Sequence, residues 1–282
     1  PTRSTVVPYP TLFRSVIITM ERLVRVAKDL RQVHRFNGYI HLKSIPGASR
    51  ELVNEAWLYA DRLSVNVEIP KEENLKLLAP EKDHKSVFAP MKYIQQGVLE
   101  SKEERQKFRH APRFAPAGQS TQMIVGATSE SDKDILYLSS ALYGRPTMKR
   151  VYYSGYVSVN TYDTRLPALK QPPLVRENRL YQADWLLRFY QFKVDEIVDD
   201  AYPDLDLEID PKLSWALRHP EQFPVDINKA DYEMLLRVPG IGVKSAKLIV
   251  ASRRFSRLGF YKNEKAKAQV RVKEEPPFRV IK

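Results

Sequence analysis

The sequence predicts an α/β protein in which helices alternate with parallel strands over residues 16–166, followed by a small all-α domain at residues 211–260. Two observations support this fold class. Between residues 17 and 159, stretches with an apolar residue at every third or fourth position, as in helices, are interspersed with short strand-like stretches, in which apolar residues alternate with polar ones or form a brief run. After residue 211 only helical patterns remain, and two of them flank a glycine-containing turn.

The first half of the α/β region contains three expected helices and two expected strands. Ser49 precedes an apolar periodic segment and is a good N-cap for the second helix. A stripe of apolar residues at helical spacing predicts the first helix: Leu23, Val26, Ala27, Leu30 and Val33. In chain order, the expected segments are helix 21–36, strand 38–47, helix 49–60, strand 63–69 and helix 71–79.

The second half of this region begins with a basic stretch at residues 102–116 that we expect to be irregular. It is followed by an expected strand at 121–127, a helix at 131–143 and a strand at 149–159. Strands separated by helices pair in parallel and carry the helices outside the sheet. Four strands indicate either an open sheet or part of a barrel, since they are too few to close a barrel alone.

Composition excludes several classes of site. The chain has 282 residues, a net charge of +12 and no cysteine, so it offers no disulfide, thiolate nucleophile or thiolate metal ligand. No apolar run approaches the roughly 18 residues of a membrane helix, and we expect no membrane association and a cytoplasmic location. Residues 1–15 resemble translated adapter sequence and lack an initiator methionine, so we expect a non-native segment there.

Residues 167–210 form a different kind of segment. A proline-rich linker leads into an expected helix at residues 178–198, and eight acidic residues without a base follow within 195–210. These acids favour a solvated face over a divalent-cation site, because they lack the glycine and the order of an EF-hand. The helix has an aromatic stripe that favours core packing, with a base-stacking or cofactor surface as the alternative: Tyr181, Trp185, Leu186, Phe189 and Phe192.

Positive charge concentrates after this acidic segment. Residues 211–282 contain 16 Lys and Arg against 7 Asp and Glu, a net charge of +9. Such a region attracts polyanions, of which nucleic acid is the commonest, although net charge alone is equally consistent with a solvated surface. The last part, residues 261–282, has no clear packing face and is expected to be a disordered tail.

The most specific pattern is FPVDINKADYEMLLRVPGIGVKSAKLIVASRR at residues 223–254. It predicts a helix over residues 229–237, capped by Asp226 or Asn228, and a second helix over 243–253. Leucine, valine, isoleucine and alanine side chains at helical spacing would hold the two helices together: Leu235, Leu236, Val238, Ile241, Ala246, Leu248 and Ile249.

The turn between these helices has the properties of an anion site. Glycine lacks a Cβ, so main-chain N–H groups can approach a phosphate, and the next helix begins there with unpaired N–H groups. The predicted contact residues are Pro239, Gly240, Ile241, Gly242, Lys244, Ser245 and Lys247. The pattern resembles the helix-hairpin-helix family of DNA repair glycosylases, Holliday-junction proteins and ligases, which implies sequence-independent DNA binding and a nucleoid-associated location. A hairpin that binds protein is the alternative.

A wider resemblance covers residues 31–260. The stretches GYIHLKSIPGAS, LSVNVEIPKEENLKLLAP, QMIVGATSESDKDILYLSSALY, RVYYSGYVSVN and LYQADWLLRFYQF resemble a radical S-adenosylmethionine protein family. That family is described as DNA modification or repair proteins, with a C-terminal helix-hairpin-helix and a partner that resembles uracil-DNA glycosylase. The resemblance implies that residues 16–166 form a partial (β/α) barrel, which corresponds to the second half of a radical S-adenosylmethionine-type barrel.

The resemblance also implies two cofactors, S-adenosylmethionine and a [4Fe–4S] cluster held by a CxxxCxxC motif. This chain lacks that motif, so we expect a fragment without cleavage activity of its own. By their position in the strand order, the resemblance implies that four residues contact S-adenosylmethionine: Asn66, Glu68, Gly126 and Ala127. Solvated strand ends are an equally good interpretation of these four residues.

Other constellations are missing from the sequence. No P-loop, GxSxG or GxGxxG motif occurs, and the five histidines have no metal-ligand spacing: His34, His41, His84, His110 and His219. Three functions therefore remain open: a fragment of a DNA repair or modification enzyme, a noncatalytic DNA-binding scaffold, and a module that docks a repair partner.

Overall fold

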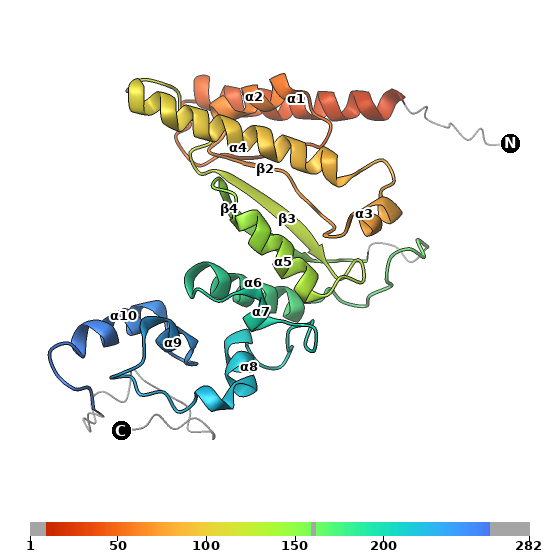
Figure 1. The fold of residues 1–282 in the computed structure, drawn as a ribbon. Coiled ribbons are helices and arrows are strands. Elements are labelled where there is room, and N and C mark those ends of the chain that lie inside the picture. Colours follow the sequence, from red (N-terminus) through yellow and green to blue (C-terminus); the bar gives the residue numbers. More distant parts are fainter. Residues whose placement is uncertain (1–9, 159–161, 260–282) are drawn as a thin grey trace. The chain divides into compact units, whose positions relative to one another are not determined.

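The computed structural model describes residues 10–158 and 162–259, with side chains described from residue 17 onward (Figure 1). The chain divides into two compact units. Residues 1–130 and 137–174 form one, called here the α/β unit, and residues 131–136 and 175–282 form the other, called the helical unit. Of the terminal segments singled out in the sequence, residues 1–9 and 261–282 lie outside the described residues.

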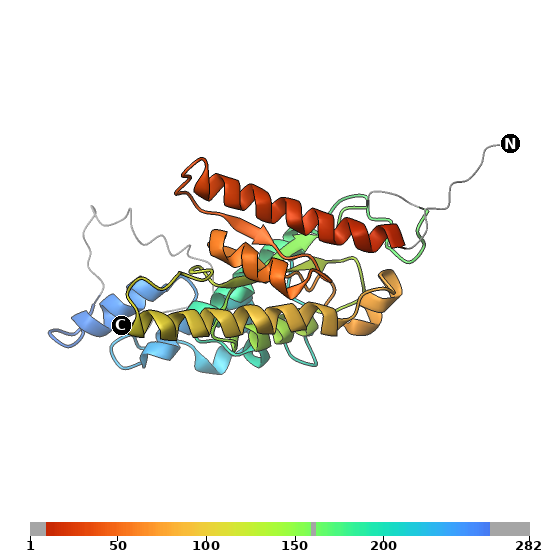
Figure 2. The same cartoon turned by 90° about the horizontal axis from the view of Figure 1, so that it is seen from above.

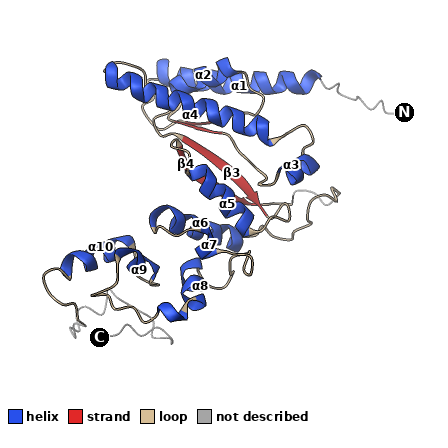
Figure 3. Ribbon diagram, viewed as in Figure 1, coloured by secondary structure: helices blue, strands red, loops and turns tan. Residues whose placement is uncertain are grey.

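The α/β unit is built on a parallel sheet of four strands in the order β1-β2-β3-β4 (Figure 3). The expectation of an α/β fold with a parallel sheet is therefore confirmed. In the described residues the sheet is open, and it does not close into a barrel. The strands are β1 (His41–Lys43), β2 (Arg62–Ser64), β3 (Gln119–Val125) and β4 (Met148–Gly155).

Helices connect consecutive strands, as the sequence pattern predicts. Ser49 caps the second helix by accepting a hydrogen bond from the Leu52 N–H, so this predicted cap is confirmed. The helices are α1 (Pro10–Gln32), α2 (Arg50–Tyr59), α3 (Glu72–Leu78), α4 (His84–Lys107) and α5 (Asp132–Tyr143), of which the first residues of α5 belong to the helical unit.

Two expectations for these helices are wrong. Helix α1 buries Met20, Val24 and Ala27, whereas Val26 and Val33 of the predicted stripe are 58% and 69% exposed. Positions 20, 24 and 27 follow one helical face, so the true stripe begins one turn earlier than the prediction placed it.

Helix α4 was missed altogether, and residues 102–107 of the stretch expected to be irregular belong to it. Pro90 lies within the helix and its last turns are strongly charged, which hides the pattern. Gly97 replaces an apolar residue on its buried face because the indole of Trp57 occupies the space that a Cβ would fill.

The connecting helices cover one face of the sheet. Gln119 of β3 donates a hydrogen bond to the Met91 carbonyl of α4 (2.9 Å). On the same face, Tyr153 of β4 donates to Ser139 of α5 (2.9 Å). Helices α1, α2 and α4 run beside one another on this side in both views (Figures 1 and 2). Strands in sequence order with right-handed crossovers place all their helices on one side, as in a barrel wall.

The opposite face of the sheet is polar. His41 of β1 reaches Ser120 of β3 across the intervening strand, with 3.3 Å between Nε2 and Oγ. Beside them, the Asn66 amide donates to Gln122 Oε1 (3.1 Å). Contact between side chains of β1 and β3 indicates that the sheet curves toward this face. A parallel sheet covered by helices on both faces would have apolar residues here.

The helical unit contains helix α6 followed by a series of shorter helices. Among the described residues these are α6 (Leu174–Phe189), α7 (Val194–Ile197), α8 (Pro211–Arg218), the 3-10 helix η1 (Pro220–Gln222), α9 (Tyr232–Arg237) and α10 (Val243–Ser252). The expected helix 178–198 is thus two helices, which the break at residues 190–193 separates. Residues 175–210 group with the C-terminal helices in one unit.

Several of the acids of residues 195–210 accept hydrogen bonds from main-chain N–H groups. Asp199 accepts from Ala201 and Tyr202, Asp206 accepts from Glu208 and Ile209, and Asp210 caps α8. The described residues contain no group of three or more potential metal ligands. The turn-forming ability of aspartate accounts for much of the acidic composition of this segment.

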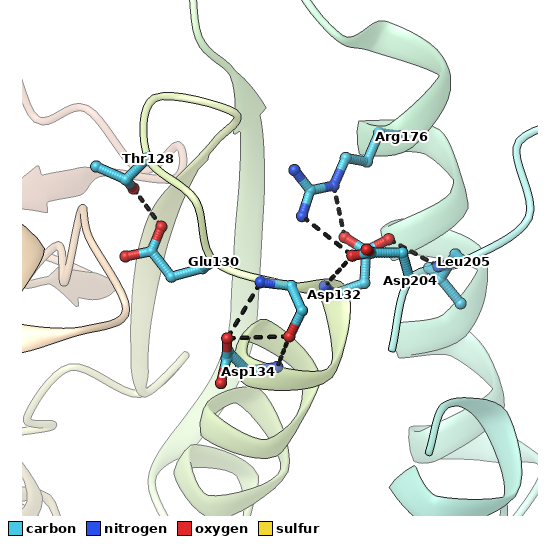
Figure 4. A network of polar contacts seen from close by, with 8 residues as sticks. Thr128, Glu130, Asp132, Asp134, Arg176, Asp204 and Leu205 are labelled. Atoms are coloured by element: carbon cyan, nitrogen blue, oxygen red, sulfur yellow. Dashed lines mark hydrogen bonds and ion pairs between the residues drawn. The ribbon is translucent and has the colours of Figure 1, made fainter. Parts of the chain in front are cut away.

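A buried carboxylate holds the acidic segment in place (Figure 4). Asp132, 1% exposed, accepts a hydrogen bond from Arg176 Nε (2.7 Å) and another from the Leu205 N–H (2.9 Å). Asp204 accepts from the Asp132 N–H in return (2.9 Å). Burial raises the pKa of Asp132, although the Arg176 guanidinium opposes this rise.

Within the described residues, no helix combines the length and the apolar character needed to cross a bilayer.

Candidate nucleic-acid interface

The two helices expected around the glycine turn are α9 and α10. Helix α10 begins at Val243, as predicted, whereas α9 begins at Tyr232, three residues after its expected start at 229. The N-cap of α9 is Asp231, which accepts from the Met234 N–H (2.7 Å), so the prediction of Asp226 or Asn228 as the cap is wrong. Asp226 instead accepts from the Asn228 N–H (2.9 Å) and closes a separate turn before the helix.

The residues between the helices, 238–242, form what is called here the 238–242 turn. The Ile241 N–H donates to the Val238 carbonyl (3.1 Å), and Gly240 has a φ of +85°. With Pro239 before it, this is the pattern of a type II turn, which requires a left-handed residue at its third position. A Cβ on Gly240 would have no heavy atom within 4 Å, so backbone conformation, rather than space, selects glycine here.

The N-terminus of α10 carries unsatisfied donors. Its N-cap is Gly242, which has no side chain to accept from the first N–H groups, whereas Ser or Asp side chains cap α2, α4, α8 and α9. Lys244, Ser245 and Lys247 are all exposed in the first turns, where no acidic residue occurs. The donors, the helix dipole and the lysines together favour an anion.

The turn is supported by a small hydrophobic cluster. Leu235, Leu236 and Ala246 are fully buried, and the partly buried Ile241 and Ile249 pack against them. Six of the seven residues expected between the helices are buried or partly buried, but Leu248 is 67% exposed and does not belong there. Ile241 was predicted to contact phosphate. Its side chain packs in this cluster and its N–H donates the hydrogen bond that closes the turn, so Ile241 has a structural role.

Two residues beneath the turn had no signal in the sequence. Lys212 of α8 is 8% exposed, and its Nζ donates to the Ile241 carbonyl at 2.6 Å. The same Nζ lies 4.8 Å from the ring centre of Tyr190, and the Tyr190 hydroxyl would lie 3.4 Å from a Cβ at Gly242. Burial lowers the pKa of Lys212 to about 8, against the opposing effect of Asp210. A cation thus lies directly behind the turn.

Arg237 ties α9 to the rest of the helical unit. Its guanidinium donates twice to Glu196 Oε1 of α7, at 2.8 Å from Nε and 2.6 Å from Nη2. It also lies 4.8 Å from the ring centre of Phe192 and 5.9 Å from that of Trp215. The α9–α10 pair is therefore anchored on a fixed base, which keeps the turn in one orientation within this unit.

The expected cofactor residues lie at the carboxyl ends of neighbouring strands in the α/β unit. The Asn66 side chain donates a hydrogen bond to Gln122, and the backbone of Glu68 is left-handed, with a φ of +64°. The Glu68 carboxylate is 3.0 Å from Lys82 Nζ and 3.6 Å from Lys43 Nζ. Carboxyl ends of parallel strands are the usual ligand-binding edge of such sheets.

The other two expected residues follow β3. Gly126 has a φ of +84°, and Ala127, 3% exposed, packs in a hydrophobic cluster with Ile69 and Leu75. Close by, Glu130 accepts a hydrogen bond from Asn74. It also accepts one from Thr128, which Figure 4 shows. The strand order thus brings the four residues to one edge of the sheet. There the side chains of Asn66 and Glu68 interact with other side chains of the protein, and Ala127 is buried in the hydrophobic core.

These residues can be compared with the groups that the resemblance implies. The chain has no cysteine and so supplies no ligand for a CxxxCxxC cluster. For S-adenosylmethionine, the Asn66 amide nitrogen and the Glu68 carboxylate are engaged within the chain, and none of the four residues has a buried side-chain donor or acceptor without a partner. No catalytic step through either group follows from these residues.

No protein-family model matches the chain, and searches of curated proteins and of solved structures found no significant match.

Proposed function

We propose that this chain binds DNA without sequence preference, through the phosphate backbone at the 238–242 turn and the N-terminus of α10. The observation that carries the proposal is the exposed Gly240, whose left-handed conformation turns the chain into a helix start without a side-chain cap. Main-chain N–H groups recognise phosphate position and carry no base information, so unrelated sequences should bind alike.

Charge supports the same partner. Lys244 and Lys247 are exposed beside the turn, and Lys212 places a further cation behind it. Neutralising phosphates releases counterions, so affinity should fall steeply as salt rises. Binding through so few contacts should be weak at physiological salt.

The polar, curved face of the sheet supports the wider resemblance to radical S-adenosylmethionine proteins, in which such a sheet would be part of a barrel interior. We therefore propose that the chain is the DNA-binding part of a repair or modification enzyme of that kind. The cysteine ligands for its cluster would come from outside the given sequence, and a glycosylase-like protein is the proposed partner. A noncatalytic scaffold is the alternative, because the given chain carries no cluster ligands.

The test is binding of the full chain to fluorescent duplexes of two unrelated sequences at several salt concentrations. The double variant Gly240→Val, Gly242→Val should weaken binding at least roughly tenfold, because the turn can no longer form. Gly259→Val is the matched control, since Gly259 is exposed with nothing within 4 Å of an added Cβ.

A second variant leaves the backbone intact. Lys244→Gln with Lys247→Gln should reduce the slope of log affinity against log salt by about 2, one per lost phosphate contact. Unchanged affinity in the glycine variant, with helicity retained by circular dichroism, would refute backbone-mediated binding.

A further inference from the structure

Helix α6 of the helical unit exposes two large aromatic side chains. Trp185 is 50% exposed and Phe189 44% exposed, although Leu186 and Phe192 of the same sequence stripe are 5% and 4% exposed. The stripe therefore divides into a buried part and an exposed part. Exposed aromatic side chains that cluster on one surface indicate a binding surface more often than isolated ones do.

The exposed part forms a surface with a groove. The rings of Trp185 and Phe189 lie 4.4 Å apart between centres, at an interplanar angle of 46°. Beside Trp185 an open groove of about 580 Å³ runs along the helix. Aromatic, apolar and hydrogen-bonding side chains line it: Val175, Asn178, Arg179, Tyr181, Gln182 and Trp185.

An arginine that forms an ion pair with Asp184 lies against these rings. The Arg188 guanidinium lies 4.7 Å from the ring centre of Phe189 and 5.9 Å from that of Trp185. Asp184, which is fully buried, holds this arginine in place through a hydrogen bond of 2.8 Å from Nε. The groove beside Trp185 adds the side chains of Arg179, Asn178 and Gln182, and aromatic rings bordered by arginine and amide groups suit a nucleobase better than a purely apolar partner.

The aromatic pair and the 238–242 turn belong to the same unit. Phe189 is followed in the chain by Tyr190, whose hydroxyl would lie 3.4 Å from a Cβ at Gly242. The residue next to the aromatic pair in the sequence therefore contacts the proposed phosphate site.

We propose that Trp185 and Phe189 are a stacking platform for an unpaired base of DNA whose backbone is held at the 238–242 turn. This inference rests on the proposed DNA binding and extends it to single-stranded or locally opened DNA. Stacking needs only the π-face that every base has, so it adds affinity for unpaired DNA without sequence preference.

The chain provides its own optical probe. Its three tryptophans are Trp57, Trp185 and Trp215, of which Trp57 and Trp215 are 8% and 4% exposed. Titration with oligo(dT) at low salt should quench the exposed tryptophan emission, and Trp185→Leu should remove that quenching. The same variant should bind oligo(dT) roughly tenfold more weakly, whereas Trp185→Phe, which keeps a ring, should lose about threefold or less.

The control is Phe108→Leu, which removes a 67% exposed aromatic ring from the α/β unit and should leave oligo(dT) binding unchanged. If oligo(dT) binds without quenching Trp185, or if Trp185→Leu binds it like the unmodified chain, the stacking platform is refuted, and a role of this surface in binding an apolar protein segment is favoured.

The glycine variant separates this failure from failure of the proposed function. Gly240→Val with Gly242→Val tests duplex binding, which does not require Trp185. One result would refute the stacking platform alone. In that result the glycine variant loses duplex affinity, whereas Trp185→Leu keeps the affinity of the unmodified chain for both the duplex and oligo(dT). If the glycine variant binds the duplex as tightly as the unmodified chain does, the phosphate-backbone site is refuted, and this inference is refuted with it.

Discussion

Replacing Lys212 with methionine should separate two opposite effects of its buried ammonium group. The side chain is 8% exposed, and its pKa falls from 10.5 to about 8 because burial penalises the charge. At about 1.4 kcal/mol per pKa unit, the buried charge costs the folded state up to about 3 kcal/mol at pH 7. Methionine has similar length and no charge, so it removes this cost together with the hydrogen bond to Ile241.

The pH dependence of the unfolding free energy isolates the cost of burying the Lys212 charge. Between about pH 8 and pH 10.5 the unfolded chain retains a proton on Lys212 that the folded chain has released. The free energy of unfolding therefore rises with pH in this window, by up to about 3 kcal/mol, relative to Lys212→Met. Other groups that titrate in this window are common to both proteins, so their contributions cancel in the difference.

DNA binding should change in the opposite direction. The positive charge behind the turn attracts phosphate, and a unit charge about 10 Å away contributes about 1 kcal/mol at an effective dielectric constant of about 40. The unmodified chain should therefore lose about fivefold in affinity as Lys212 deprotonates, and Lys212→Met should start from the weaker value.

The assay is urea unfolding at several pH values, paired with fluorescence anisotropy on one duplex. The difference between the two unfolding free energies should change with pH across this window. Parallel curves for the unmodified chain and the Lys212→Met variant would refute the reasoning, because they would mean that burial of this amine does not alter its protonation.

Two further predictions concern stability. Asp132→Asn should destabilise the chain by about 1–3 kcal/mol in chemical unfolding, because the amide nitrogen that replaces one carboxylate oxygen cannot accept the hydrogen bond from Arg176 or from the Leu205 N–H. Gly97→Ala should cost about 1–3 kcal/mol, because the new methyl group would overlap the indole of Trp57 and the ring of Phe114.

Matched variants make both stability tests specific. Asp200→Asn removes an ion pair with Lys133 in which the carboxylate side chain is fully exposed, and such a pair contributes little. Gly259→Ala adds a methyl group where nothing lies within 4 Å. If either control costs as much as its partner variant, burial is not the cause of the loss.

Local sequence signals predicted the features that depend on local physics. Ser49 as a cap, the glycine turn at 240 and the start of α10 all follow from residue types that favour one backbone geometry. The four strands were recognisable as short segments in which apolar residues alternate with polar ones or form a brief run, as expected of strands with one buried face. Their order in the sheet was not predicted and is seen only in the structure.

Features that depend on tertiary packing were not predictable in this way. Helix α4 has Gly97 and Ser101 on its buried face, positions that do not read as apolar, and only the bulky Trp57 opposite explains the glycine. Lys212 is another case, since it contacts a carbonyl 29 residues away and lies in a short helix where an exposed lysine would be ordinary.

The aromatic stripe of α6 shows what the sequence could have revealed. Successive helical residues are about 100° apart, so Trp185 and Phe189 lie within about 40° of each other, nearly opposite Ala183 and Leu180. Ala183 and Leu180 are fully buried, and one helix face is enough for a core contact. The aromatic pair therefore lies on the face that the core does not need. The exposure of Trp185 and Phe189 could have been inferred from their angular position around the helix axis. The prediction instead relied on hydrophobicity and assigned all five residues to one stripe.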